Sequence, residues 1–128
     1  MILITGGAYH GKRNYAKQMY PGIDFVDGIS CAEETIFACQ GMDHFHSYIE
    51  NRMHEGKKLP ELLKMVEKLK RENPEIVLIT DEIGYGIVPV DAFYREYRET
   101  HGRVCTQIAA EAKEVHRVIC GIGTVIKG

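Results

Sequence analysis

The chain has 128 residues, of which 45% are hydrophobic and 27% charged, and its formal net charge is −2. This length fits one domain spanning residues 1–128, and the small charge gives no electrostatic reason to expect a nucleic acid or an anionic membrane as a partner. We expect a cytoplasmic protein, because no apolar run approaches the roughly 20 residues of a membrane span and the first residues lack the regions of a signal peptide. The four cysteines form no Cys-x-x-Cys pair, which favours reduced thiols over disulfides or metal ligands.

The chain begins with the layout of a phosphate-binding loop. Residues 2–4 are a short apolar run, a glycine-rich stretch follows with Gly6 and Gly11 at its ends, and Lys12 opens a segment able to form a helix. Glycines let successive backbone N–H groups point at an anion, and the N-terminus of a helix adds partial positive charge. We therefore expect a nucleotide to bind the residues of this loop, which are Gly6, Gly7, Ala8, Tyr9, His10, Gly11, Lys12 and Arg13. The alternative is a glycine-rich turn that only joins a strand to a helix.

Arg13 stands where the loop pattern Gly-x-x-x-x-Gly-Lys-Ser/Thr has a hydroxyl. That hydroxyl ligates the Mg²⁺ that accompanies the nucleotide, whereas a guanidinium cannot ligate a cation, so the sequence leaves Mg²⁺ binding open. Asp27, at the end of a short strand predicted over residues 23–28, is the candidate Mg²⁺ ligand, because an acidic strand end beside the loop helps to hold the ion. The alternative for Asp27 is a turn residue before Gly28.

The middle of the chain is predicted to be helical. Residues 33–40 are expected to form a short helix, and residues 42–53 a longer one, because their apolar residues share one helical face. His44 and His46 would diverge on that helix, since residues two apart do not share a face, so we do not expect a metal site there. The strongest amphipathic pattern covers residues 59–71.

The segment 75–80, with a continuous apolar run at residues 76–79, predicts a strand that is covered on both faces of a parallel sheet. Ligands of open α/β sheets lie beyond the carboxyl ends of the strands. We therefore expect Thr80, Asp81 and Glu82 to point towards the same region as the loop.

The last third of the chain is predicted to contain a helix over residues 90–112, interrupted near His101 and Gly102. Strands are expected at residues 116–120 and 124–127. Strands and helices thus alternate, which predicts an α/β domain with three layers, α/β/α, around a mainly parallel sheet.

Several stretches of the sequence form a distinctive combination. They are Ile4-Thr5-Gly6-Gly7-Ala8 with Gly11-Lys12, then Val26-Asp27, the run Val-Leu-Ile-Thr-Asp-Glu-Ile-Gly-Tyr-Gly-Ile-Val-Pro at residues 77–89, Tyr94-Arg95-Glu96-Tyr97-Arg98, Gly102-Arg103-Val104, and Gly121-Ile122-Gly123 with Lys127. Together they resemble the adenosylcobinamide kinase / adenosylcobinamide-phosphate guanylyltransferase family. The resemblance covers residues 1–16 and about 76–128, and the middle more loosely. It implies a P-loop NTPase fold of the RecA-like kind.

Members of that family phosphorylate the aminopropanol hydroxyl of adenosylcobinamide with a nucleoside triphosphate, and then transfer GMP from GTP to that phosphate through a guanylylated histidine. The resemblance therefore implies GTP or ATP as the nucleotide, a cobinamide-type small molecule as the acceptor, and a homo-oligomer, often a trimer. It implies catalytic roles for Lys12, which would stabilise the transferring phosphoryl group, and for Glu82, as a base or a water-holding residue. Asp27 would organise Mg²⁺.

The chain departs from this family in three places. Arg13 replaces the loop hydroxyl, and Cys105-Thr106 replace the Asn-Gln that follows the Gly-Arg-Val stretch. The several dozen residues that carry the guanylyl-accepting histidine, between the first helix and the acidic strand, have no counterpart. None of the available histidines can be assigned that role by its motif; they are His10, His44, His46 and His54.

Three functions remain open on the sequence. The first is a shortened kinase-type member with weak or absent guanylyl transfer. The second is a non-catalytic relative that binds a nucleotide or a partner, in which Arg13 neutralises phosphate charge or pairs with Asp27 and excludes Mg²⁺. The third is a full transferase with a relocated histidine.

Overall fold

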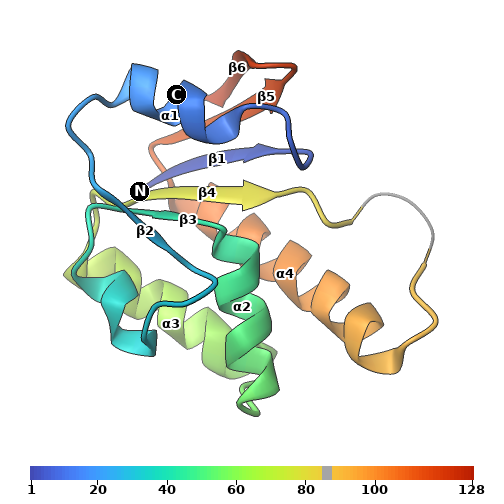
Figure 1. The fold of residues 1–128 in the computed structure, drawn as a ribbon. Coiled ribbons are helices and arrows are strands. Elements are labelled where there is room, and N and C mark those ends of the chain that lie inside the picture. The colour runs from blue at the N-terminus through green and yellow to red at the C-terminus, as the bar shows by residue number, and fades with distance from the viewer. Residues whose placement is uncertain (85–87) are drawn as a thin grey trace.

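The computed structural model describes residues 1–84 and 88–128, which form one six-stranded sheet with helices on both faces (Figure 1). In chain order its elements are β1 (Ile2–Gly6), α1 (Lys12–Met19), β2 (Phe25–Asp27), the 3₁₀ helix η1 (Glu33–Phe37), β3 (Gly41–Asp43), α2 (Phe45–His54), α3 (Leu59–Glu72), β4 (Val77–Asp81), α4 (Ala92–Glu111), β5 (Glu114–Ile119) and β6 (Ile122–Lys127). Among the described residues, no helix combines the length and apolar character of a membrane span.

The strands lie in the order β2-β3-β4-β1-β5-β6. Strands β1 to β5 pair in parallel, and β6 pairs antiparallel with β5. In the central register, Ile2 of β1 lies between Val77 of β4 and Glu114 of β5. The prediction of an α/β domain with a mainly parallel sheet is therefore confirmed, with the C-terminal hairpin as the antiparallel exception.

The two faces of the sheet are covered unequally. Helices α2, α3 and α4 lie on one face, and α1 lies on the other (Figure 1). Successive side chains of a strand point to opposite faces, so Leu3 packs in the large core beneath α2, α3 and α4, while Ile2 and Ile4 pack in a smaller core with Ala16 of α1. This burial of residues 2–4 fixes the end of β1, from which the loop leaves the sheet.

Two predicted elements match the structure closely. The amphipathic pattern over residues 59–71 forms α3, whose first turn is stabilised by Glu61, which accepts a hydrogen bond from the Lys58 N–H at 3.2 Å. The apolar run at residues 75–80 forms β4, whose residues 77–80 are buried. The pattern buries Leu62, Val66 and Leu69 of α3 and residues 77–80 of β4.

Three predicted elements are wrong in part. Residues 42–53 do not form one helix: Gly41–Asp43 is strand β3, and His44 separates it from α2 with a left-handed φ of 54°. The segment 33–40 contains a 3₁₀ helix over Glu33–Phe37 rather than an α-helix. Helix α4 continues without interruption through Gly102.

The physical reasons for these departures from the prediction differ between β3 and α4. Strand β3 contains only one apolar residue, Met42, and exists because its backbone pairs with both β2 and β4. Helix α4 tolerates Gly102 because the neighbouring His101 and Val104 are buried against the sheet, and such tertiary packing offsets the roughly 1 kcal/mol that a glycine costs a helix. The remaining boundaries shift by at most two residues: the strand predicted over 23–28 is Phe25–Asp27, and those predicted over 116–120 and 124–127 are Glu114–Ile119 and Ile122–Lys127.

Candidate functional site

The loop between β1 and α1 is held in shape by close backbone contacts. A Cβ atom on Gly6 would lie 2.4 Å from the Val118 carbonyl oxygen, so only glycine allows this approach of β1 to β5. Gly11 has a left-handed φ of 81° immediately before α1. His10 ties the loop to the turn between β5 and β6, because its carbonyl accepts from the Gly121 N–H at 2.8 Å and its Nδ1 accepts from the Cys120 N–H at 3.0 Å.

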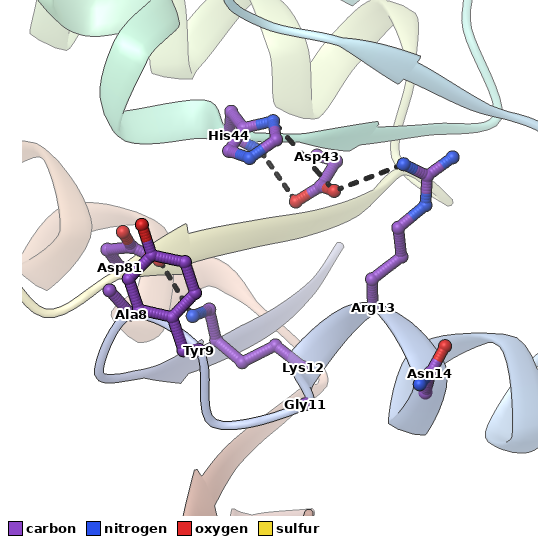
Figure 2. A pocket seen from close by; sticks show the side chains of 9 residues that line it. All are labelled: Ala8, Tyr9, Gly11, Lys12, Arg13, Asn14, Asp43, His44 and Asp81. Carbon is purple, nitrogen blue, oxygen red and sulfur yellow. Dashed lines mark hydrogen bonds and ion pairs between the residues drawn. The ribbon is translucent and has the colours of Figure 1, made fainter.

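A hollow of about 300 Å³ lies between this loop and the ends of two strands. Figure 2 shows Lys12, Arg13 and Tyr9 from the side of the loop, facing Asp43, His44 and Asp81 from the ends of β3 and β4. The remaining lining residues are Ala8, Gly11 and Asn14. The hollow therefore combines two cations with two carboxylates at the carboxyl edge of a parallel sheet, where ligands of α/β folds bind.

Lys12 is the innermost cation of the hollow. Its Nζ donates to the Gly7 carbonyl at 2.8 Å and lies 2.7 Å from Asp81 Oδ1. Its exposed fraction is only 7%, so the ammonium group lies within the curve of the loop. An anion that enters the loop would meet this group and can replace Asp81 as its partner.

Arg13 and Asp43 face one another at the outer side of the hollow. Arg13 Nη1 lies 3.8 Å from Asp43 Oδ2, and Asp43 Oδ1 accepts from the His44 N–H at 2.8 Å. The Asp43 carboxylate is largely buried, while the Arg13 side chain is more than half exposed. Arg13 is thus free to swing away from Asp43 at little packing cost.

Asp43 is a site residue that the sequence analysis missed, and Asp27 does not lie where it was expected. Asp27 was expected on a strand beside β1, but β2 is the outermost strand, and β3 and β4 separate it from β1. Its Oδ1 accepts from the Ile29 N–H at 2.9 Å, and this hydrogen bond is the main reason that the Asp27 pKa is lowered, with His44 adding to it. Each of β2, β3 and β4 ends in an aspartate. Had β3 been predicted as a strand, its final aspartate, Asp43, would have been a candidate site residue.

Of the three residues at the end of β4, Asp81 and Glu82 reach the loop as expected, but on opposite sides of it, and Thr80 does not. Thr80 is buried, with its Oγ1 2.8 Å from His101 Nε2. Only Asp81 lines the hollow beside Lys12. Glu82 lies in a second hollow of about 340 Å³ on the other side of the loop, where Arg117 donates to it through Nε at 2.8 Å and through Nη2 at 3.1 Å.

His44 and His46 also differ from expectation, because they do not diverge. His44 precedes α2 in a left-handed conformation, and the two ring centroids are 5.8 Å apart. His46 Nδ1 accepts from the Asp81 N–H at 3.1 Å, and His46 Nε2 lies 3.4 Å from Asp81 Oδ2. Burial lowers the pKa of His46 and lowers that of His101 to about 4.

No group of three or more His, Cys, Asp or Glu side chains within residues 1–84 and 88–128 is placed to hold a metal ion by itself. Mg²⁺ commonly takes only one or two carboxylates, together with waters and phosphate oxygens of a nucleotide. Asp43, which ends β3 beside the hollow, fits that use. The Tyr-Gly-Ile part of the run at residues 77–89 lies outside the described residues.

The family model described as "Cobinamide kinase / cobinamide phosphate guanyltransferase" matches residues 26–126. The chain belongs to this family. Over 67 residues it is 42% identical to the bifunctional adenosylcobalamin biosynthesis protein CobU of Escherichia coli K12 and 40% identical to the protein of the same name from Salmonella typhimurium. Each match covers 52% of this chain but only 37% of the relative. The family match begins after the loop, so the role of residues 6–13 depends on the geometry described above.

Proposed function

We propose that this chain binds GTP or ATP at the loop formed by residues 6–13 and transfers the terminal phosphoryl group to the hydroxyl of a cobinamide-type acceptor, as a P-loop kinase of cobalamin biosynthesis. The observation that carries this proposal is the position of Lys12 at the start of α1, 2.7 Å from Asp81 at the end of β4 and inside the hollow that Asp43 also lines. Family membership supports the acceptor class.

Each group of the hollow has a role in such a transfer. Backbone N–H groups of the loop and the N-terminus of α1 hold the phosphates, and Lys12 stabilises the charge on the transferring group. Asp43 holds Mg²⁺ or its water shell, which is the role that the sequence had suggested for Asp27. Arg13 must leave Asp43 for this to happen, and its guanidinium is then available to a phosphate oxygen.

Guanylyl transfer is not part of this proposal. His10 and His46 each use Nδ1 to accept a backbone hydrogen bond, from Cys120 and from Asp81 respectively. His54 lies at the end of α2, where its ring stacks on Phe93 at a centroid distance of 4.2 Å. Incubation with α-labelled GTP tests this point: an acid-labile label on the protein would show that a histidine has taken over the transfer.

The main test measures binding and product formation. Lys12→Ala should weaken ATP or GTP binding by at least about tenfold, since it removes the cation inside the loop. Lys17→Ala is the matched control, because it removes a lysine from the exposed face of the same helix. Mass spectrometry after incubation with Mg²⁺, nucleotide and adenosylcobinamide should show a phosphorylated product. Unchanged affinity of Lys12→Ala would contradict the proposal.

A second candidate is a non-catalytic nucleotide-binding relative, and the ion pair between Arg13 and Asp43 is the observation in its favour. In that case Arg13 takes the place of the cation, and the carboxylate that would hold Mg²⁺ stays occupied. Titration of ATP and GTP with and without Mg²⁺ separates the two functions. Tight binding that is independent of Mg²⁺, without turnover, favours the second candidate, whereas Mg²⁺-dependent product formation excludes it.

A further inference from the structure

We propose that Asp81 accepts the proton of the acceptor hydroxyl, and that His46 is the positioning residue that holds the Asp81 carboxylate for this step. The inference rests on the phosphoryl transfer proposed above. It assigns to Asp81 the role of base that the sequence had suggested for Glu82.

Asp81 is the carboxylate closest to where the transfer must occur. Its Oδ1 lies 2.7 Å from Lys12 Nζ, the group that contacts the transferring phosphate. The Asp81 side chain is 25% exposed, so an acceptor in the hollow can reach it. A base must lie within hydrogen-bond reach of the proton that it accepts, and Asp81 meets this condition for a hydroxyl that attacks beside Lys12.

The two rival carboxylates are engaged elsewhere. Both oxygens of Glu82 accept hydrogen bonds from Arg117, and Glu82 lies in the second hollow, across the loop from Lys12. Asp43 accepts from the His44 N–H and faces Arg13. Asp81 therefore combines access to the first hollow with proximity to Lys12.

His46 is oriented by the backbone of Asp81 itself. The Asp81 N–H donates to His46 Nδ1 at 3.1 Å, so Nδ1 carries no proton, and in a neutral imidazole the proton must be on Nε2. His46 Nε2 itself lies 3.4 Å from Asp81 Oδ2. Asp81 thus anchors the ring through its backbone N–H, and the second ring nitrogen lies beside the Asp81 carboxylate.

Binding of the nucleotide frees Asp81. Asp81 is the counter-ion of Lys12 in this structure, and the terminal phosphate of a bound nucleotide takes this cation away from it. The acceptor oxygen then bonds to the γ-phosphorus, and the bond from that phosphorus to the bridging oxygen breaks. The electron pair leaves with the nucleoside diphosphate, and the hydroxyl proton passes to Asp81 Oδ1 while His46 continues to hold Oδ2.

Asp81→Asn tests the inference through two effects of opposite sign. The variant should bind ATP or GTP roughly three- to tenfold more tightly, because the competitor for Lys12 loses its charge. It should form phosphorylated adenosylcobinamide at least about 100-fold more slowly, because the base is gone. Asp24→Asn is the matched control, an exposed carboxylate on the segment before β2. A variant that had merely lost structure would lose both binding and transfer.

His46 is tested by two substitutions. His46→Ala should slow transfer by about tenfold or more while leaving the affinity for nucleotide near that of the wild type, since both ring nitrogens face Asp81. His46→Gln, whose side-chain amide can still donate to the carboxylate, should restore part of the rate. Equal losses in binding and transfer, without rescue by glutamine, would contradict the positioning role.

The outcomes separate this inference from the proposed function. Wild-type protein that forms no phosphorylated product overturns the proposed function, and the inference with it. Active wild type with an Asp81→Asn variant that transfers at a similar rate, or that binds nucleotide more weakly, overturns the inference alone. A larger loss of transfer in Glu82→Gln than in Asp81→Asn would return the role of base to Glu82.

Discussion

Arg13 Nη1 lies 3.8 Å from Asp43 Oδ2, and this contact joins the first turn of α1 to the end of β3 (Figure 2). The guanidinium of Arg13 thus faces the carboxylate to which we assign Mg²⁺ in the proposed function. The charges of these side chains balance, because Lys12 faces Asp81 just as Arg13 faces Asp43. A triphosphate adds negative charge to the hollow, and either Mg²⁺ or Arg13 must then compensate that charge.

Arg13→Ser should make nucleotide binding more dependent on Mg²⁺. The substitution frees Asp43 and supplies a hydroxyl that can ligate the ion, so the ratio of affinities with and without Mg²⁺ should rise by about tenfold over that of the wild type. Calorimetric titration with ATP and GTP measures both affinities. Lys17→Ser removes the same charge from the exposed face of α1 and should leave the ratio unchanged. An unaltered ratio in Arg13→Ser would show that Arg13 does not compete with the ion.

Gly6→Ala should destabilise the protein by about 1–3 kcal/mol. The added Cβ would lie 2.4 Å from the Val118 carbonyl oxygen, a backbone atom of β5 that can move only if the sheet moves with it. Urea denaturation measures the change in the free energy of unfolding. Gly84→Ala is the control, because a Cβ there meets no atom of residues 1–84 and 88–128 within 4 Å. Equal stability of the two variants would mean that β1 and β5 lie further apart than described.

Tyr15→Phe should cost about 1–3 kcal/mol, the usual penalty for a buried polar group that loses its partner. His116 is fully buried, and its Nδ1 lies 2.6 Å from the Tyr15 hydroxyl, while its Nε2 lies 2.9 Å from Glu114 Oε1. This contact joins α1 to β5 beneath the loop. Tyr94→Phe removes an exposed hydroxyl and should change the free energy of unfolding by less than about 0.5 kcal/mol. A neutral Tyr15→Phe would show that His116 does not depend on the hydroxyl.

The free energy of unfolding should fall as the pH is lowered from about 6.5 to about 4. Burial lowers the pKa of His101 from 6.5 to about 4 in the folded protein, so the unfolded chain binds a proton at this residue in a range where the folded chain does not. The penalty is absent above pH 6.5 and complete below pH 4, where it is roughly 3 kcal/mol. His46, whose pKa is also lowered, acts in the same direction.

His101→Gln provides the measurement for this effect. Denaturation curves between pH 4 and pH 7 should show a shallower decline of stability for the variant than for the wild type. A parallel decline in both proteins would assign the pH dependence to other groups, such as Asp27, whose lowered pKa also costs stability in acid.

Gly102→Ala should stabilise the protein by about 0.5–1 kcal/mol. Gly102 lies in the interior of α4, where a Cβ meets no atom within 4 Å. The glycine therefore costs helix stability without giving a close approach in return. Thermal unfolding followed by circular dichroism measures the gain, and a loss of stability would show that the position needs a glycine for a contact outside the described residues.

The sequence was sufficient for the elements with strong patterns. Residues 2–4 and 77–79 are continuous apolar runs because they are buried on both faces of the sheet, and burial of that kind is visible in the composition of a segment. The glycine spacing of the loop could also be recognised in the sequence, because each glycine meets a local requirement of the backbone. Gly6 allows a close approach to β5, and Gly11 has a left-handed φ. Strand β3 could not be predicted from its own residues, because it is backbone pairing with the neighbouring strands that makes this segment a strand.

The candidate site was harder to predict because it depends on strand order and on side-chain direction. Nothing local to Asp27 reveals that β2 lies at the edge of the sheet, and so the carboxylate of Asp43 was overlooked in its favour. Asp81 and Glu82 are neighbours in an extended segment, where successive side chains point to opposite sides. They therefore enter two different hollows, and the sequence alone could not tell which one faces Lys12.

The sheet ends on β6, which pairs on one side with β5 and is the outermost strand there. Ile122, Val125 and Ile126 are each more than half exposed on it. An outermost strand presents a row of backbone N–H and C=O groups that another strand can use. The C-terminal hairpin therefore offers both an apolar surface and a template for sheet growth, at the strand whose turn is also bonded to the loop through His10.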